Sequence, residues 1–191
     1  MVLGHYAAAY LVRPHQRESP LWLLLLSANL HEFLWLLLAL LGIESPEPSS
    51  LLDASFANLI VSMTYSHNLV PNLLLSLGVL TLVQLWKKQF SLSLACAFLC
   101  ASHVWLDYLV GFEHQILGED SLSIGLNSYH RMPEIAILME LGFAWICLSY
   151  YRLKSPEQKA REVRLLFLAF SAGILAWLPV ASTPLRQLLG L

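Results

Sequence analysis

Long apolar runs separated by short polar segments dominate this chain. A helix needs about 20 apolar residues to cross a bilayer, and only helices and closed barrels span one. The run lengths therefore predict an all-α integral membrane bundle with about five spanning helices. We expect these spans at residues 20–43, 56–86, 90–110, 133–151 and 165–180. No internal repeat or composition change divides the chain, so one membrane-embedded domain over residues 1–191 is expected.

Two parts of the pattern are irregular. The second run is longer than a bilayer core requires, its first half is rich in polar residues, and Pro71 lies within it. Because proline inside a helix removes a hydrogen bond and clashes with the preceding turn, we expect a kink or break there. Residues 1–19 contain an apolar piece that is too short to span.

Composition supports a membrane protein and narrows its partners. The chain is 57% hydrophobic and 13% charged, whereas a soluble domain carries about 25% charged residues. The net charge is -2 and no basic patch is present, so we expect no nucleic-acid partner. Cys96, Cys100 and Cys147 lie inside apolar runs without a CxxC motif, which favours small buried side chains over ligands or disulfides.

The basic residues predict an orientation. With a cytoplasmic N-terminus, nine of the 11 Lys and Arg residues fall on the inner side, and only Arg131 and Arg186 fall outside. The positive-inside rule therefore favours N-in and C-out. No cleavable signal peptide is evident, because no small-residue cleavage site follows the first long run.

The apolar runs contain ionisable residues, and these are the candidate functional groups. His103 and Asp107 are four residues apart, so they share one face of a helix, and His114 continues this stripe if the helix extends past Gly111. Each charged group in a bilayer costs about 2.5–3.5 kcal/mol on insertion scales. Further groups come from other spans, namely His31, Glu32, His67 and Glu140. A divalent metal would neutralise several of them together, and imidazole with carboxylate suits zinc or iron.

Other roles are open for each residue. A single histidine in a span is more often a hydrogen-bonded packing residue than a ligand, and Glu134 can simply favour a helix N-terminus. A cluster from four spans is harder to explain in this way. Three functions are compatible with it: a metal-dependent hydrolase, a metal-ion or proton relay, and a non-catalytic membrane scaffold.

An ordered set of short motifs resembles the predicted membrane-bound metal-dependent hydrolases, which are small bacterial inner-membrane proteins distantly similar to zinc-dependent phospholipase C. The matching pieces run in the order of that family through residues 4 to 151. They are Gly4-His5, Ala28 to Trp35, Leu41 to Glu44, Tyr65-Ser66-His67-Asn68-Leu69, Ser102 to Asp107, Gly125-Leu126, Pro133 and Glu140. The Tyr-Ser-His and Ser-His-x-x-Leu-Asp pieces are the most specific.

The resemblance implies a zinc-like divalent ion and a multi-pass protein of the bacterial inner membrane. It places His5, His67, His103 and Asp107 on ligand positions, with Glu32 where an aspartate is usual. The chain also departs from the family pattern. His31 replaces a usual proline, and Gly111 and His114 stand where histidine and aspartate are usual. The implied metal set is His5, Glu32, His67, His103, Asp107 and His114.

The expected chemistry is attack of a metal-activated water on a phosphoester or lipid-like substrate. Glu140 or Glu32 would accept the proton, and the partners would be membrane lipid or a small phosphoester. One requirement is unusual. His5 precedes the inward-facing Arg13, whereas Asp107 is near the outer end of its span. Both residues can touch one metal only if the N-terminal segment enters the membrane or the orientation is reversed.

Overall fold

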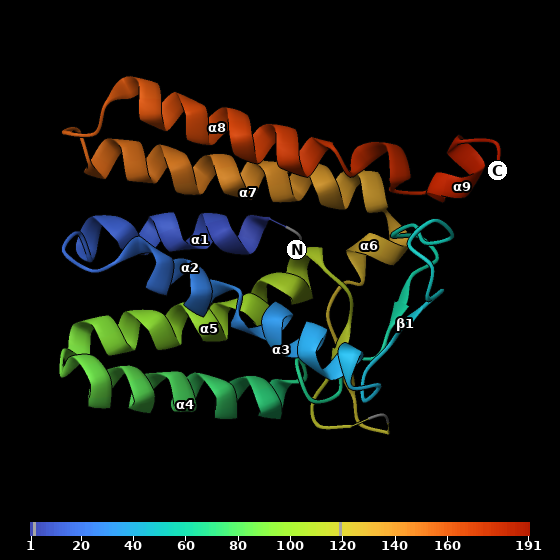
Figure 1. The fold of residues 1–191 in the computed structure, drawn as a ribbon, viewed down its shortest axis with the longest axis horizontal. Helices are drawn as coiled ribbons and strands as arrows, with labels where there is room; N and C mark the ends of the chain where they lie inside the picture. Colours follow the sequence, from blue (N-terminus) through green and yellow to red (C-terminus); the bar gives the residue numbers. More distant parts are fainter. Residues whose placement is uncertain (2, 119) are drawn as a thin grey trace.

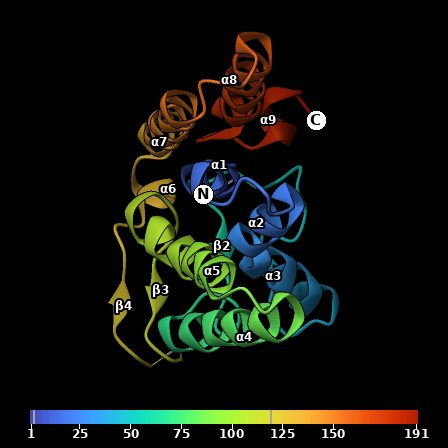
Figure 2. The same ribbon diagram turned by 90° about the vertical axis from the view of Figure 1, so that its left-hand side faces the viewer.

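The computed structural model describes residues 1, 3–118 and 120–191 and shows a helical bundle (Figures 1 and 2). The longer helices are α1 (Gly4–Val12), α2 (Leu21–Ala28), α3 (Leu30–Leu40), α4 (Leu69–Lys87), α5 (Phe90–Val110), α7 (Pro133–Lys154) and α8 (Ala160–Leu175). Short helical pieces are α6 (Ser128–Arg131), α9 (Leu185–Leu188) and the 3₁₀ turns Arg13–His15 and Leu178–Val180. Two small antiparallel pairs join β1 (Pro46–Glu47) to β2 (Ile60–Val61) and β3 (His114–Gln115) to β4 (Ser123–Ile124).

The predicted all-α membrane bundle is confirmed. Within the described part of the chain, four helical segments are long and apolar enough to cross a membrane, namely α4, α5, α7 and Ala160–Val180. The pair α2 and α3 would be a fifth span, bent by 58°. The third predicted span coincides with α5, and the fourth extends three residues beyond the prediction, to Lys154.

The first predicted span is broken rather than continuous. The break lies at Asn29, whose backbone leaves the helical region at φ -120° and ψ 15°. Its side-chain Nδ2 donates to the carbonyl of Leu25 at 3.1 Å, which is the competition with backbone hydrogen bonding that makes asparagine poor inside helices. The break turns α3 away from α2 and leaves the Ala28 carbonyl at a helix end, where it can accept a side-chain hydrogen bond.

Only the second half of the second predicted span forms a helix. Helix α4 begins only at Leu69, so Pro71 lies in its first turn, where proline is tolerated, and produces no kink. Residues 56–68 instead form turns and strand β2. The polar residues of this segment therefore belong to a folded loop next to the bundle.

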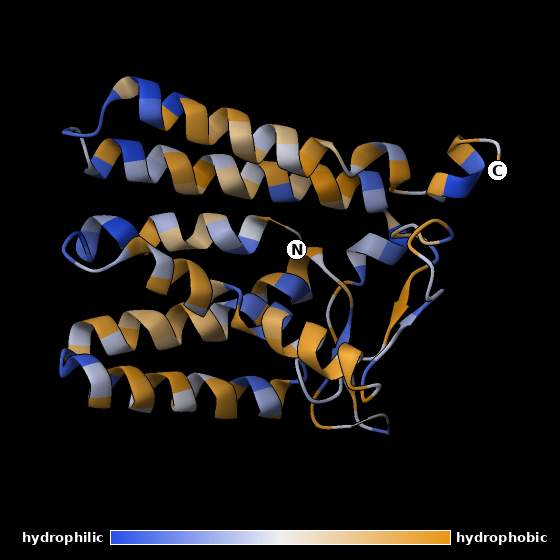
Figure 3. Cartoon of the chain, in the orientation of Figure 1, coloured by the Kyte–Doolittle hydropathy of each residue, from blue (hydrophilic) through white to orange (hydrophobic). Residues whose placement is uncertain are grey.

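Helix α5 lies at the centre of the bundle and packs against α4, α2, α7 and α1. Its buried apolar side chains include Leu92, Leu99 and Val104. Helix α1 lies between α7 and α2, where Ala7, Ala8 and Ala9 are buried and permit close backbone approach (Figure 1). The three cysteines are free and buried, as predicted. Many large apolar side chains of the outer helices are exposed, as lipid contact requires. Figure 3 shows that apolar residues are frequent along these helices.

The two ends of the bundle differ in charge. The α1–α2, α4–α5 and α7–α8 connections lie at one end, and the segments around them contain nine of the 11 basic residues (Figures 1 and 3). The strand pairs, α6 and α9 lie at the other end (Figure 1). The predicted grouping of basic segments is therefore observed, while the side that faces the cytoplasm stays a prediction. Helix α1 runs inward from the basic end, so the N-terminal segment does enter the bundle.

Candidate metal centre

The centre is built around His103 and Asp107 in the second half of α5, both of which are buried. Nδ1 of His103 lies 2.7 Å from the carbonyl oxygen of Ala28. Because a carbonyl can only accept, Nδ1 carries the proton and donates it, and Nε2 presents a lone pair. Nε2 lies 3.7 Å from Oδ2 of Asp107. Metal-binding histidines are commonly oriented by such a bond from the nitrogen that faces away from the ion.

His67 is oriented by two polar residues. Oγ of Ser66 donates to Oε2 of Glu44 at 2.7 Å, so the hydroxyl proton is already used. Nδ1 of His67, 2.8 Å from the same Oγ, must therefore be the donor to it. Glu44 also accepts from the backbone N–H groups of Tyr65 and Ser66 at 2.6 and 3.1 Å. This carboxylate holds the loop that carries His67.

The consequence is that two lone pairs face each other. Nε2 of His67 lies 3.3 Å from Nε2 of His103, and neither atom has a proton of its own to donate in the neutral rings. A cation between them would turn this repulsion into attraction. Zinc–nitrogen bonds of about 2.0–2.1 Å in a tetrahedron place two ligand nitrogens about 3.3–3.4 Å apart. The observed separation fits that geometry.

Carboxylates complete the group. Oε1 of Glu32, on α3, lies 3.7 Å from Nε2 of His103, and its side chain is 33% exposed. One atom each from Glu32, His67 and His103 lie within 4.8 Å of one another, and so do one atom each from His5, His103 and Asp107. The two sets share His103. Buried groups of this composition could hold a metal ion.

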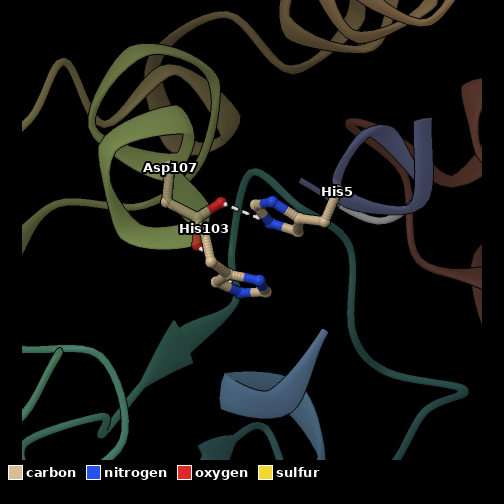
Figure 4. Close-up of side chains that lie close together, drawn as sticks. All are labelled: His5, His103 and Asp107. Atoms are coloured by element: carbon tan, nitrogen blue, oxygen red, sulfur yellow. Dashed lines mark hydrogen bonds and ion pairs between the residues drawn. The ribbon is translucent and has the colours of Figure 1, made fainter. Parts of the chain in front are cut away.

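His5 joins the centre from α1. Nε2 of His5 lies 3.2 Å from Oδ1 of Asp107, and its ring stacks on that of His103 with centroids 3.5 Å apart (Figure 4). The amino group of Met1 contacts the same Oδ1 and lies 3.0 Å from Nε2 of His5. The space beside Asp107 therefore accommodates a positive charge. His5 therefore converges with His103 and Asp107, an arrangement that the sequence left open.

His114 approaches by a different route from the one predicted. Helix α5 ends at Val110, so His114 does not continue its stripe but lies in β3. The loop nevertheless returns it to the centre, with Nε2 3.8 Å from Oδ2 of Asp107 and its ring stacked on His67 at 5.3 Å. The absence of a side chain at Gly111 makes room for this carboxylate, because a Cβ there would lie 2.5 Å from Oδ1 of Asp107.

Glu140 lies outside both sets and holds α1 in place. Its Oε1 accepts from the backbone N–H groups of Leu3 and Gly4 at 2.5 and 2.7 Å, and its Oε2 accepts from the hydroxyl of Tyr129 at 2.6 Å. A carboxylate at a helix N-terminus satisfies free N–H groups and interacts favourably with the helix dipole. The predicted catalytic role of Glu140 stays a prediction, and its contacts give it a positioning role for His5.

The sequence did not reveal which residues support the candidate ligands. Glu44 and Ser66 belong to the motifs quoted above, but the sequence assigns neither of them a role. His31 is one of the ionisable residues in the apolar runs, and its ring stacks on His103 with centroids 4.9 Å apart. Burial lowers the pKa of His67, and neighbouring His103 lowers it further, which favours the neutral ring that binds metals.

Comparisons with family models, with characterised proteins and with solved structures gave no match for this chain. The resemblance to the predicted membrane-bound metal-dependent hydrolases therefore rests on the motifs and stays a hypothesis. The geometry supports a coarser conclusion: the chain is an all-α bundle with four or five helices able to cross a membrane, and it contains buried histidine and carboxylate groups that could hold a metal ion.

Proposed function

We propose that this protein is a membrane-embedded metal-dependent hydrolase of the family its motifs resemble, acting on a phosphoester or lipid-like substrate. The observation that carries the proposal is the 3.3 Å approach of the His67 and His103 Nε2 atoms. Both rings have their Nδ1 hydrogen committed to an outward acceptor, so the pair is arranged for a cation. Zinc is the metal that best fits this separation and this donor set.

The residues of the centre divide into proposed metal ligands and a proposed proton acceptor. His67 and His103 would hold the ion together with one carboxylate of the two groups that share His103; Asp107 is the carboxylate that also contacts His5 and His114. Three protein ligands leave a position for water, as catalytic zinc sites require. When bound, the ion supplies an acidified water and a polarised substrate oxygen. Glu32 is the partly exposed carboxylate at the edge of the group, which suits it as the proton acceptor.

The proposed reaction balances without a further reactant. A water oxygen forms a bond to phosphorus while the ester P–O bond breaks. Glu32 accepts one proton from the water and returns it to the leaving alcohol oxygen. His103 and His67 would keep their Nδ1 protons, which they donate to the Ala28 carbonyl and to the Ser66 hydroxyl oxygen.

Metal analysis of the purified protein tests the proposal. We expect about one zinc per chain, and we expect His103→Ala to lower the zinc content at least tenfold, on the order of metal-site losses. His15→Ala is the matched control, because this histidine is exposed and contacts Tyr150 at the basic end. A wild-type protein that stays metal-free after incubation with zinc, cobalt and iron, with ester turnover unaffected by His103→Ala, would contradict the proposal.

One observation favours a second function, a metal-ion or proton relay. The buried face of α5 carries a polar stripe that leads from the basic end to the centre. Its polar members are Ser93, His103 and Asp107, and the small buried side chains of Cys96 and Cys100 lie between them. Buried polar residues in line along a span mark ion pathways in many membrane proteins. Zinc or proton flux in proteoliposomes, without turnover of any ester, would favour this function over hydrolysis.

A further inference from the structure

Two cavities of opposite character meet beside the candidate metal centre. The first has a volume of about 300 Å³ and touches Glu32, Asp107 and His114. The rest of its wall is mainly apolar, with Phe33, Trp35, Leu36, Phe56 and Phe112 among the lining residues. A cavity of this kind accepts a hydrocarbon chain and presents its end to the polar group.

The wall of this cavity is formed partly by helix α3. Phe33 and Leu36 of α3 line the cavity, and their outer surfaces are exposed by 45% and 49%. Helix α3 belongs to the bent apolar pair that is long enough to span a membrane. These two side chains thus lie both on the cavity wall and on the exposed surface of α3, so a lipid chain could enter the cavity sideways between them.

The second cavity is larger, at about 560 Å³, and lies among the loops at the less basic end. Polar side chains on its wall include Ser45, Ser62, Thr64, Asn68 and Asn127. Glu47 and Glu113 also line it, while the described lining residues include no Lys or Arg. This basin therefore suits a hydroxyl-rich or amine-bearing group better than an anion.

The two cavities share part of their walls. His114 and Phe112 line both, as do Val61 and Met63 of the loop before α4. His114 also lies 3.8 Å from Oδ2 of Asp107, so the place where the cavities meet is next to the candidate metal ligands. One molecule can extend from the apolar cavity, past the centre and into the basin.

We infer that the substrate is a membrane phospholipid with an amine-bearing, zwitterionic headgroup, taken sideways from the bilayer. Its acyl chain lies in the apolar cavity beside Phe33 and Leu36, its phosphate lies at the metal centre, and its amine lies in the basin near Glu47 and Glu113. The proposal rests on the proposed function for the role of the metal, but the two cavities make a separate prediction about binding. The proposal also identifies α3 as the helix that recognises the acyl chain of the lipid.

Native mass spectrometry of the detergent-purified protein, titrated with defined lipids, tests this inference. The probes are dioleoyl phosphatidylethanolamine, dioleoyl phosphatidylglycerol, glycerophosphoethanolamine without chains and inorganic phosphate. Leu36→Trp fills the apolar cavity from α3. Leu37→Trp is the matched control, because the next residue is equally exposed at 53% and does not line the cavity.

We expect one phosphatidylethanolamine to bind per chain, at least about tenfold more tightly than phosphatidylglycerol. We expect Leu36→Trp to lower the affinity for phosphatidylethanolamine at least about tenfold, and Leu37→Trp to leave it unchanged. Equal binding by the two tryptophan variants would overturn the apolar subsite. Equal binding of the two dioleoyl lipids, or of glycerophosphoethanolamine or phosphate, would overturn the assigned lipid class. Zinc content measured on the same samples distinguishes failure of the lipid proposal from failure of the metal proposal. Selective lipid binding by a protein without zinc would contradict only the metal proposal.

Discussion

His67 and His103 are each held by a hydrogen bond on the nitrogen that faces away from the other ring. The acceptors are the hydroxyl of Ser66, itself tied to Glu44, and the carbonyl of Ala28. These contacts set the tautomer of both rings, so they control whether the inner nitrogens can bind a metal. At the scale of single residues, the candidate centre therefore depends on groups that would not themselves contact a bound ion.

Ser66→Ala tests this dependence. It removes the acceptor for Nδ1 of His67 and a partner of Glu44. We expect zinc affinity to fall about 10- to 100-fold, the usual loss when an orienting partner is removed. Competition titration with a fluorescent chelator measures the change. Thr81→Ala, which removes an exposed hydroxyl on α4, should have no effect. An unchanged affinity in Ser66→Ala would show that the ring needs no such support.

Gly111→Ala tests the close approach of the backbone to Asp107. The added Cβ would lie 2.5 Å from Oδ1 and 2.9 Å from the carboxyl carbon, so the carboxylate must move. We expect about 1–3 kcal/mol of destabilisation, typical of overpacking, together with weaker zinc binding. Gly78→Ala is the control, since a Cβ at that position meets nothing within 4 Å. Thermal unfolding with and without zinc provides the measurement, and equal behaviour of the two variants would contradict the expectation.

Helix α1 is the element that brings His5 to the centre. Its nine residues extend about 14 Å at 1.5 Å per residue, roughly half of a 30 Å hydrocarbon core. It therefore reaches the middle of the bundle from the basic end and stops there. The N–H groups of Leu3 and Gly4 at its start have no partner within the helix, and Glu140 on α7 supplies the acceptor.

Glu140→Gln should weaken the attachment of the start of α1 to α7. Glutamine keeps the size of the side chain but loses the charge and presents an NH₂ group where acceptors are required. We expect a loss of about 1–3 kcal/mol in stability and weaker zinc binding through displacement of His5. Glu134→Gln, near the exposed start of α7, is the control. If Glu140→Gln abolished ester turnover without changing stability or zinc affinity, the catalytic role would be favoured over the positioning role.

At the scale of the whole molecule, charge and hydropathy together define the arrangement in the membrane. The connections that carry the basic residues gather at one end, and the loops that carry His67 and His114 gather at the other (Figure 1). The centre is therefore closer to the less basic end. The positive-inside rule predicts that this end faces away from the cytoplasm.

Cysteine labelling tests the orientation. Leu51→Cys and Leu122→Cys place a thiol at the less basic end, and Gln89→Cys and Lys159→Cys place one at the basic end, all at exposed positions. The native cysteines are buried and should remain unlabelled. We expect an impermeant maleimide to label only the first pair in intact cells and both pairs after permeabilisation. The reverse pattern would invert the orientation, and labelling of one member of each pair would contradict the bundle.

Much of the architecture was predictable because it depends on local patterns. The length of apolar runs decided the membrane class and the bounds of α5, and the spacing of His103 and Asp107 placed them on one face. The distribution of Lys and Arg predicted which connections share an end. Each of these features comes from neighbouring residues or from total charge, so no knowledge of packing is needed to read it.

The assembly of the centre was decided by tertiary structure. His5 and Asp107 meet across 102 positions, His114 returns through a loop after its helix has ended, and the Glu44 and Ser66 support lies in segments that hydropathy assigns to a loop and a span. The break at Asn29, which frees the Ala28 carbonyl for His103, is a competition between one side chain and its own helix. The sequence by itself determined that buried charges had to be satisfied, because lipid cannot solvate them. Which groups satisfy one another was settled only when the packed helices brought them within a few ångströms.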